Sequence, residues 1–155
     1  MSLSIELTAI FSRDLERVAQ EVAAFPSDEA LWQTKSGVTN SAGNLALHLE
    51  GNIREYIGRQ IGGIAYQRER PFEFSATGIS RAEVAARIDS VRRIIAPALA
   101  LAPMDEIFPE NVLGLPLTTR QFLLHLLAHL NYHLGQIDYL RRVTTGDGAI
   151  RLAML

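Results

Sequence analysis

Apolar residues recur along the chain at the three- and four-residue spacing of helices, and no segment alternates convincingly with the two-residue period of a strand. Four stripes predict helices over residues 3–25, residues 41–61, from Ser80 onward, and from Thr118 to just before Gly146. In the third segment, Pro97 is expected to end or kink the helix, because proline removes a backbone N–H and crowds the preceding turn. The pattern therefore predicts four helices.

Residues that cap helices stand at the predicted starts. Ser41 can accept hydrogen bonds from the free N–H groups of a first turn. Ser80 with Glu83, and Thr118 with Gln121, have the three-residue spacing of a capping box. These signals place three of the four helix starts to within a few residues.

The segment between the second and third helices, residues 62–79, is long for a connection within a helical bundle. We expect Phe72 and Phe74 to pack in this crossover. The simplest architecture is an all-α fold, a four-helix bundle with this long second-to-third connection, formed by residues 1–155 as one domain.

Composition restricts the function classes. Apolar types make up 48% of the 155 residues and charged types 21%, enough to bury a core. Fifteen basic against seventeen acidic residues give a net charge of −2, which argues against binding the phosphate backbone of nucleic acids. The absence of cysteine excludes disulfides, thiolate metal sites and a cysteine nucleophile.

The amino-terminal segment has an early acidic residue and no long apolar run, which is unlike a secretory signal. The longest apolar stretches are far shorter than the roughly 20 residues of a membrane-spanning helix. We therefore expect a cytoplasmic protein without a membrane partner.

Three of the four histidines follow one another at four-residue steps on the fourth predicted helix: His125, His129 and His133. A step of four residues turns the helix by only about 40°, so all three share one side. His129 and His133 should point toward the interior, with His125 nearer the rim. Imidazoles four residues apart have Cβ atoms about 5–6 Å apart and can converge on one cation.

His48, on the second predicted helix, is the remaining histidine and the candidate third ligand. Three imidazoles with an open fourth position are typical of catalytic metal sites. Asn52 and Glu55 lie on the same edge as His48 and are candidate catalytic or substrate-orienting groups, although a solvated helix edge would look the same. An all-nitrogen site accepts several divalent metals, and affinity order alone does not select among them. We expect zinc or nickel, with iron, cobalt, copper and manganese as alternatives.

Several other sites are excluded by pattern. The metalloprotease motif H-E-x-x-H is absent, because leucines occupy positions 126 and 130. The Glu-x-x-His pairs of di-iron bundles are also absent.

A lone H-x-x-x-H pair also occurs in helices that bind no metal, so histidines that serve only packing are the simpler alternative.

Two segments resemble the DinB/YfiT-like superfamily of metal-dependent enzymes: N-L-A-L-H-L-E-G-N-I at 44–53 and H-L-L-A-H-L-N-Y-H-L-G-Q at 125–136. The resemblance extends over nearly the whole chain. It implies an up-down-down-up four-helix bundle with a long crossover after the second helix. It also implies a divalent metal held by His48, His129 and His133. A further implication is that the protein forms homodimers.

Some members of this superfamily activate a low-molecular-weight thiol. The leading hypothesis is therefore a metal-dependent enzyme acting on a small molecule, either a thiol-dependent transferase or a hydrolase that activates water. The alternative is a non-catalytic bundle that binds a small molecule or acts as a dimeric interaction protein.

Overall fold

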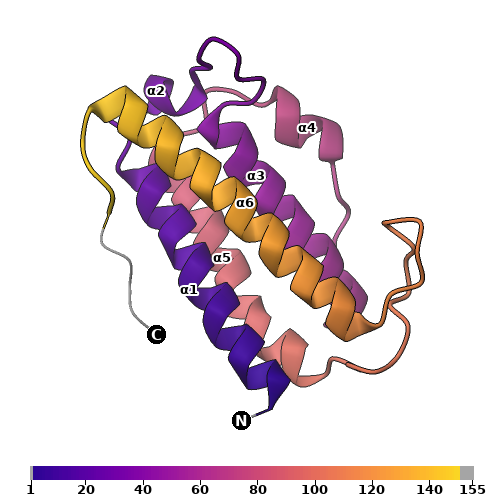
Figure 1. Cartoon of the computed structure of the whole chain (residues 1–155). Helices are drawn as coiled ribbons and strands as arrows, with labels where there is room; N and C mark the ends of the chain where they lie inside the picture. Colours follow the sequence, from indigo (N-terminus) through magenta and orange to yellow (C-terminus); the bar gives the residue numbers. More distant parts are fainter. Residues whose placement is uncertain (1, 151–155) are drawn as a thin grey trace.

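The computed structural model describes residues 2–150, and within them the chain is built from helices (Figure 1). Apart from one isolated bridge between Ile107 and Thr118, the described residues contain no β-structure, which confirms the all-α class. The elements are α1 (Leu3–Ala23), α2 (Asp28–Trp32), α3 (Ala42–Ile53), the π-helix η1 (Arg54–Ile61), α4 (Arg70–Ser75), α5 (Arg81–Ala100) and α6 (Thr119–Thr145).

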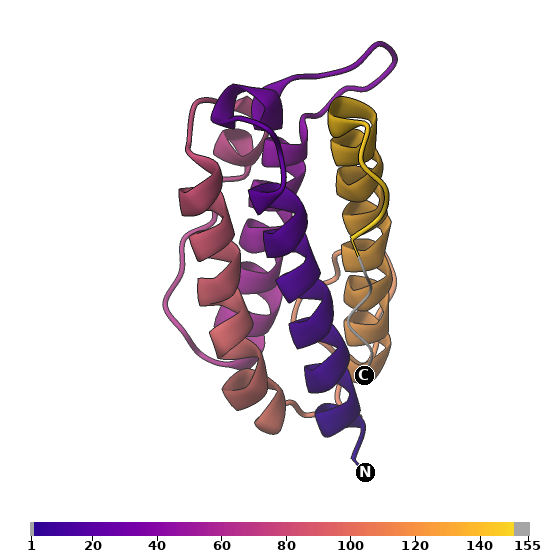
Figure 2. The same cartoon turned by 90° about the vertical axis from the view of Figure 1, so that its left-hand side faces the viewer.

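The long helices α1, α3, α5 and α6 lie side by side, and the short helices α2 and α4 lie at one end (Figures 1 and 2). α1 packs against α5 and α6, and η1 packs against α5. α3 packs against both α4 and α6. α3 therefore lies between α4 and α6, and side chains of all three helices meet around His48.

The predicted stripes form the core. The residues of the α5 stripe, for example Val84, Ile88 and Val91, are fully buried, and Leu123 and Leu130 of α6 are buried with them. Burying one such side chain stabilises the fold by about 1.5–3 kcal/mol. The same apolar face fixes the rotation of α6 about its axis, which sets where its histidines point.

The predicted caps are present. The side chains of Ser41 and Ser80 accept hydrogen bonds from backbone N–H groups of the first turns of α3 and α5. Thr118 and Gln121 form the full capping box at the start of α6. A left-handed Gly146, with φ of 78°, ends the same helix.

The helix predicted over 41–61 is present, but it is α-helical only from Ala42 to Ile53 and continues to Ile61 as the π-helix η1, whose wider turns change which side chains share a face. α5 does not end at Pro97 but continues to Ala100. Burial of Ala98 and Leu99 in the core offsets the hydrogen bond that the proline cannot donate.

α1 and α6 are joined by a buried ion pair. The guanidinium of Arg141 donates to the carboxylate of Glu21, and both residues are shielded from solvent. Arg141 also donates to the backbone oxygen of Gly148, 2.9 Å away, which ties the segment after α6 to the helix. This pairing holds the helix that carries two of the candidate ligands.

Across residues 2–150, no helix combines the length and the apolar character that crossing a membrane requires.

Candidate metal centre

Three imidazoles from two helices lie close together, that of His48 buried and those of His129 and His133 half-buried. Nε2 of His129 lies 3.3 Å from Nε2 of His48 and 3.1 Å from Nε2 of His133. Each of these histidines offers one ligand atom, and the three atoms all lie within 4.8 Å of one another. The structure therefore brings together, from α3 and α6, the three histidines that the sequence selects.

The opposite nitrogens of two of these rings are held by oxygen acceptors. Nδ1 of His48 lies 2.9 Å from Oε2 of Glu73, closer than its other neighbour, the Arg68 guanidinium at 3.4 Å. Nδ1 of His133 lies 2.7 Å from Oε1 of Gln136. A carboxylate or amide oxygen accepts, so both imidazoles carry their hydrogen on Nδ1. Their Nε2 lone pairs are thus both directed at the space beside His129.

This arrangement fits a cation better than a set of hydrogen bonds. A neutral imidazole has one N–H, so His129 cannot satisfy both neighbouring lone pairs fully. For bonds of about 2.0–2.1 Å in a tetrahedral site, ligand nitrogens lie about 3.3–3.4 Å apart, close to the two shorter separations found here. The outer hydrogen bonds to Glu73 and Gln136 are those that usually orient ligand histidines. The three residues could hold one divalent ion.

Electrostatics keep the imidazoles ready to bind a cation. Burial, helped by the nearby imidazoles of His133 and His48, lowers the pKa of His129 to about 4. Burial also lowers the pKa of His133, against the opposing effect of its bond to Gln136. A neutral imidazole has a free lone pair, so neither ring must lose a proton before a metal can bind at neutral pH.

The Glu73 carboxylate comes from α4, in the segment that the sequence presents as a connection. Burial raises the pKa of this carboxyl, but hydrogen bonds from His48 and Arg68 outweigh burial and hold the pKa below its ordinary value. Nε and Nη2 of Arg68 donate to its two oxygens over 2.6 and 2.8 Å. The amide of Asn44 donates to the backbone oxygens of Glu73 and Ala76, which fastens α4 to α3.

Gly51 makes this approach of α4 possible. It lies inside α3, and a Cβ at this position would overlap the carboxylate of Glu73. A glycine in a helix interior costs about 0.5–1 kcal/mol relative to alanine. We infer that the glycine keeps space for the carboxylate that orients His48.

Gly51→Ala should therefore favour the helix but weaken metal binding. Displacing Glu73 from His48 is expected to lower the affinity for zinc or cobalt about tenfold, measured by competition with a chromophoric chelator. The matched control is Gly135→Ala in α6, where a Cβ meets no atom within 4 Å. A G51A protein that binds metal as tightly as the G135A protein would contradict this role.

A cavity of about 380 Å³ opens directly onto two of the imidazoles. It has two arginines in its wall and, among its described lining residues, no aspartate or glutamate. Its wall is made of His48, Asn52, Tyr56, Arg68, Arg70, Val112, Phe122, His125, Leu126 and His129. A small molecule in this cavity would contact the open side of the histidine cluster.

Of the two other candidate residues, the structure places only Asn52 in this cavity. Glu55 does not line it, and its carboxylate accepts hydrogen bonds from Arg59. Glu55 and Tyr56 both lie in the π-helix η1, where each residue advances by less than the 100° of an α-helix, and only Tyr56 lines the cavity. Tyr56 follows His48 and Asn52 at four-residue steps, so helical spacing could have selected it.

His125 lies on the cavity wall but outside the cluster. Its ring is exposed, with its centre 6.5 Å from that of His129 and 6.2 Å from that of Phe122. This is the rim position that the helical arithmetic predicts. His125 can meet a ligand in the cavity without sharing the ion.

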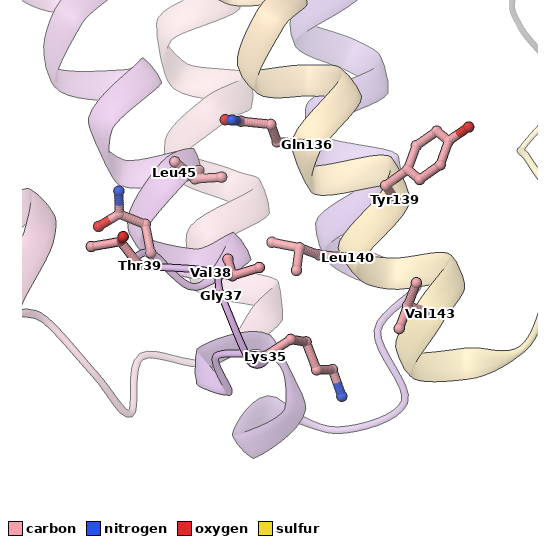
Figure 3. Close-up of a pocket in the computed structure, with 10 residues that line it drawn as sticks. Lys35, Gly37, Val38, Thr39, Leu45, Gln136, Tyr139, Leu140 and Val143 are labelled. Atoms are coloured by element: carbon pink, nitrogen blue, oxygen red, sulfur yellow. The ribbon is translucent and has the colours of Figure 1, made fainter.

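A larger cavity, about 480 Å³, lies between the C-terminal part of α6 and the loop before α3 (Figure 3). Its wall is mainly apolar and includes Leu45, Leu140 and Val143. Gln136 also lines it and is the link to the cluster, through its bond to His133. Since none of the three candidate ligands lines this space, we place the chemistry in the smaller cavity.

The pKa of His129 predicts how the metal-free protein responds to acid. The unfolded chain takes up this proton near pH 6.5, but the folded protein does so only near pH 4. Between these values the unfolded state binds more protons, so the free energy of unfolding falls as the pH is lowered from about 6.5 to about 4. Above about pH 6.5 the imidazole is neutral in both states, and His129 no longer makes the free energy of unfolding depend on pH.

Thermal unfolding of chelator-treated protein across this pH range measures the effect. A His129→Gln protein should show a shallower fall in Tm, with the remainder due to other groups whose pKa folding lowers, His133 and Glu73 among them. Equal slopes for the two proteins would contradict the lowered pKa.

Comparison with known proteins places the chain in a family. A search of curated proteins finds no match. A family model described as "Protein of unknown function (DUF1572)" matches residues 6–154. The matched residues include the three candidate ligands and the helices α3 and α6 that carry them. The chain belongs to this DUF1572 family.

Proposed function

We propose that the protein is a divalent-metal-dependent enzyme that acts on a small molecule in the cavity beside His48 and His129. One observation supports the proposal: the Nε2 atoms of three histidines lie close together, while Glu73 and Gln136 hold the opposite nitrogens of two of them. We propose zinc or nickel as the ion, with iron, cobalt, copper and manganese as alternatives. An ion held there would lower the pKa of a thiol or water that it binds.

The composition of the cavity favours a thiol-dependent transferase. Hydrolysis of an ester or amide generally uses a group that transfers a proton to the leaving group, and no carboxylate lines the described cavity wall to do so. Addition of a metal-bound thiolate to an electrophile makes no such demand, because the cation itself stabilises the thiolate. Hydrolysis is the second candidate reaction, with the rim residue His125 as its base.

The protein's own groups orient the reactants. Burial raises the pKa of Tyr56, so its hydroxyl stays protonated and can donate a hydrogen bond to an oxygen of the substrate. Phe74 packs on His48, with ring centres 4.9 Å apart, and helps to exclude water from one side of the cluster. Asn52 offers an amide in the cavity wall.

We also propose that the family belongs to the DinB/YfiT-like superfamily and that the fold is its up-down-down-up four-helix bundle, with residues 62–79 as the crossover. Support comes from the side-by-side packing of the long helices. A cytoplasmic homodimer is part of the proposal. The exposed apolar residues Tyr132, Tyr139 and Val143 on α6 support a protein contact there.

Metal analysis and a substrate screen test the proposal. Untagged protein, purified without a nickel column, should carry about one equivalent of a divalent metal. The metal-loaded protein should then accelerate the conjugation of small thiols to 1-chloro-2,4-dinitrobenzene, and chelation should abolish the acceleration. Parallel assays on nitrophenyl esters and anilides would reveal a hydrolase.

The alternative is a non-catalytic bundle that binds a small molecule or serves as a dimeric interaction protein. Protein that holds no metal even after incubation with zinc, nickel or cobalt would support this alternative and overturn the enzyme proposal.

A further inference from the structure

The cavity beside the histidine cluster has an excess of positive charge. Arg68 lies in its wall but is paired with Glu73, so these two charges offset each other. Arg70 also lies in the wall, is exposed, and has no carboxylate partner among the described residues. Any divalent ion on the three neutral imidazoles would add further positive charge. A substrate that balances this charge must be anionic.

Arg70 is held in a position suited to recognition. Its guanidinium carbon lies 5.5 Å from the centre of the Phe74 ring, and that ring packs on His48. Stacking on an aromatic ring limits the motion of the guanidinium and leaves its N–H groups free to donate. A guanidinium with free N–H groups matches a carboxylate, which can accept two parallel hydrogen bonds.

Asn52 adds a second requirement. Its side chain is in the cavity wall, is more than nine-tenths buried, and its Oδ1 has no hydrogen-bond partner among the described residues. A buried acceptor without a donor costs about 1–3 kcal/mol, so a ligand that supplies an N–H or O–H would remove this cost. Asn52 follows His48 by one helical turn. The N–H or O–H group of the ligand would therefore lie beside the ligand atom that contacts the histidine cluster.

We propose that the substrate, or one of two substrates, is a small carboxylate whose anionic group pairs with Arg70, with an N–H or O–H group that Asn52 accepts. This inference rests on the proposed metal-dependent function and adds the chemical class of the ligand. Arg70 and Asn52 are binding residues in this account, and the metal ligands remain His48, His129 and His133.

The test uses cobalt-loaded protein and two matched probes. N-acetyl-L-cysteine and N-acetyl-L-cysteinamide both carry a thiol and an amide N–H, but only the first carries a carboxylate. Thiolate binding to cobalt gives a near-ultraviolet charge-transfer band, so titration yields a Kd for each probe. The wild-type protein should bind the carboxylate probe about tenfold more tightly than the amide probe.

Arg70→Gln should reduce this preference to about twofold or less. The control, Arg93→Gln, removes an exposed charge on α5 outside the cavity and should keep the full preference. Comparing the same two probes across proteins cancels the difference between their thiol pKa values. Asn52→Ala should weaken both probes about equally, by several-fold, and leave the cobalt spectrum without probe unchanged.

Two results would overturn the carboxylate assignment: equal binding of the two probes by the wild-type protein, or a preference that survives in the R70Q protein. In both cases cobalt still binds and the proposed function stands. A protein that binds no cobalt would instead overturn the proposed function, and this inference with it.

Discussion

Replacing His129 with alanine should abolish stable binding of divalent metals, whereas replacing His125 with alanine should not. Nε2 of His129 is the atom that lies close to both of the other candidate ligands, at 3.3 and 3.1 Å. Loss of a residue that only orients a ligand typically lowers metal affinity 10–100-fold, so loss of the ligand itself should lower it by more than about a hundredfold. Competition with a chromophoric chelator measures the affinities.

His125→Ala is a matched control because it removes the same side chain one turn away on the same helix. His125 is exposed and lies outside the cluster, so its removal should change zinc affinity by no more than about twofold. Circular dichroism and Tm should show that both variants are folded. Equal losses in the two proteins, or stoichiometric tight binding by H129A, would contradict the assignment of the three ligands.

The sequence suffices to locate the three imidazoles because they lie on regular helices. His129 and His133 are one turn apart, and the apolar stripe of α6 fixes the side on which they project. His48 lies in the α-helical part of its segment, before η1 begins. Wherever the 100° step holds, spacing along the chain gives direction in space.

The wall of the cavity is less predictable because the helical step changes at Arg54. Counting by α-helical steps puts both Glu55 and Tyr56 near the edge that carries His48, but in η1 only Tyr56 lines the cavity. Nothing in the residue types of this segment marks a π-turn. The choice between these two side chains therefore comes only from the structure.

The residues that orient the imidazoles also differ in whether the sequence alone can predict them. Gln136 is one turn beyond His133 on the same helix, so spacing alone could have selected it. Glu73 and Arg68 come from a connection without helical periodicity, and their position depends on contacts between distant segments, such as Asn44 with α4. Tertiary contacts of this kind leave no local pattern in a single sequence.

Glu73→Gln should lower both the stability of the protein and its affinity for metal. The side chain of Glu73 is 4% exposed, and that of its partner Arg68 is 13% exposed. Removing one charge of a mostly buried pair leaves the other uncompensated, which we expect to cost about 2–3 kcal/mol, less than a fully buried pair. In a chain of this length the cost corresponds to a fall in Tm of about 5–10 °C.

The effect on metal binding arises separately, from the loss of a charged acceptor for Nδ1 of His48. A neutral amide accepts more weakly and can present its NH₂ group to the ring instead, so the tautomer with a free Nε2 lone pair is less favoured. We expect a 10–100-fold lower affinity for zinc, measured by chelator competition.

Glu50→Gln is the control that separates these two effects. Glu50 is also buried on α3 and paired with arginines, Arg54 and Arg87, but has no contact with the three histidines. E50Q should lose stability without losing metal affinity. If E50Q and E73Q bound zinc equally well, Glu73 would have only a structural role.

A double variant, Arg68→Gln with Glu73→Gln, separates the effect of the ion pair on folding from the effect of the Glu73–His48 bond on metal binding. Removing both charges leaves no buried ion without a partner, so part of the stability lost in E73Q should return. Metal affinity should remain low, because His48 still lacks its carboxylate. Recovery of stability without recovery of affinity would assign the ion pair to folding and the Glu73–His48 bond to the ligand set, whereas recovery of both would mean that Glu73 acts on the metal centre only by neutralising Arg68.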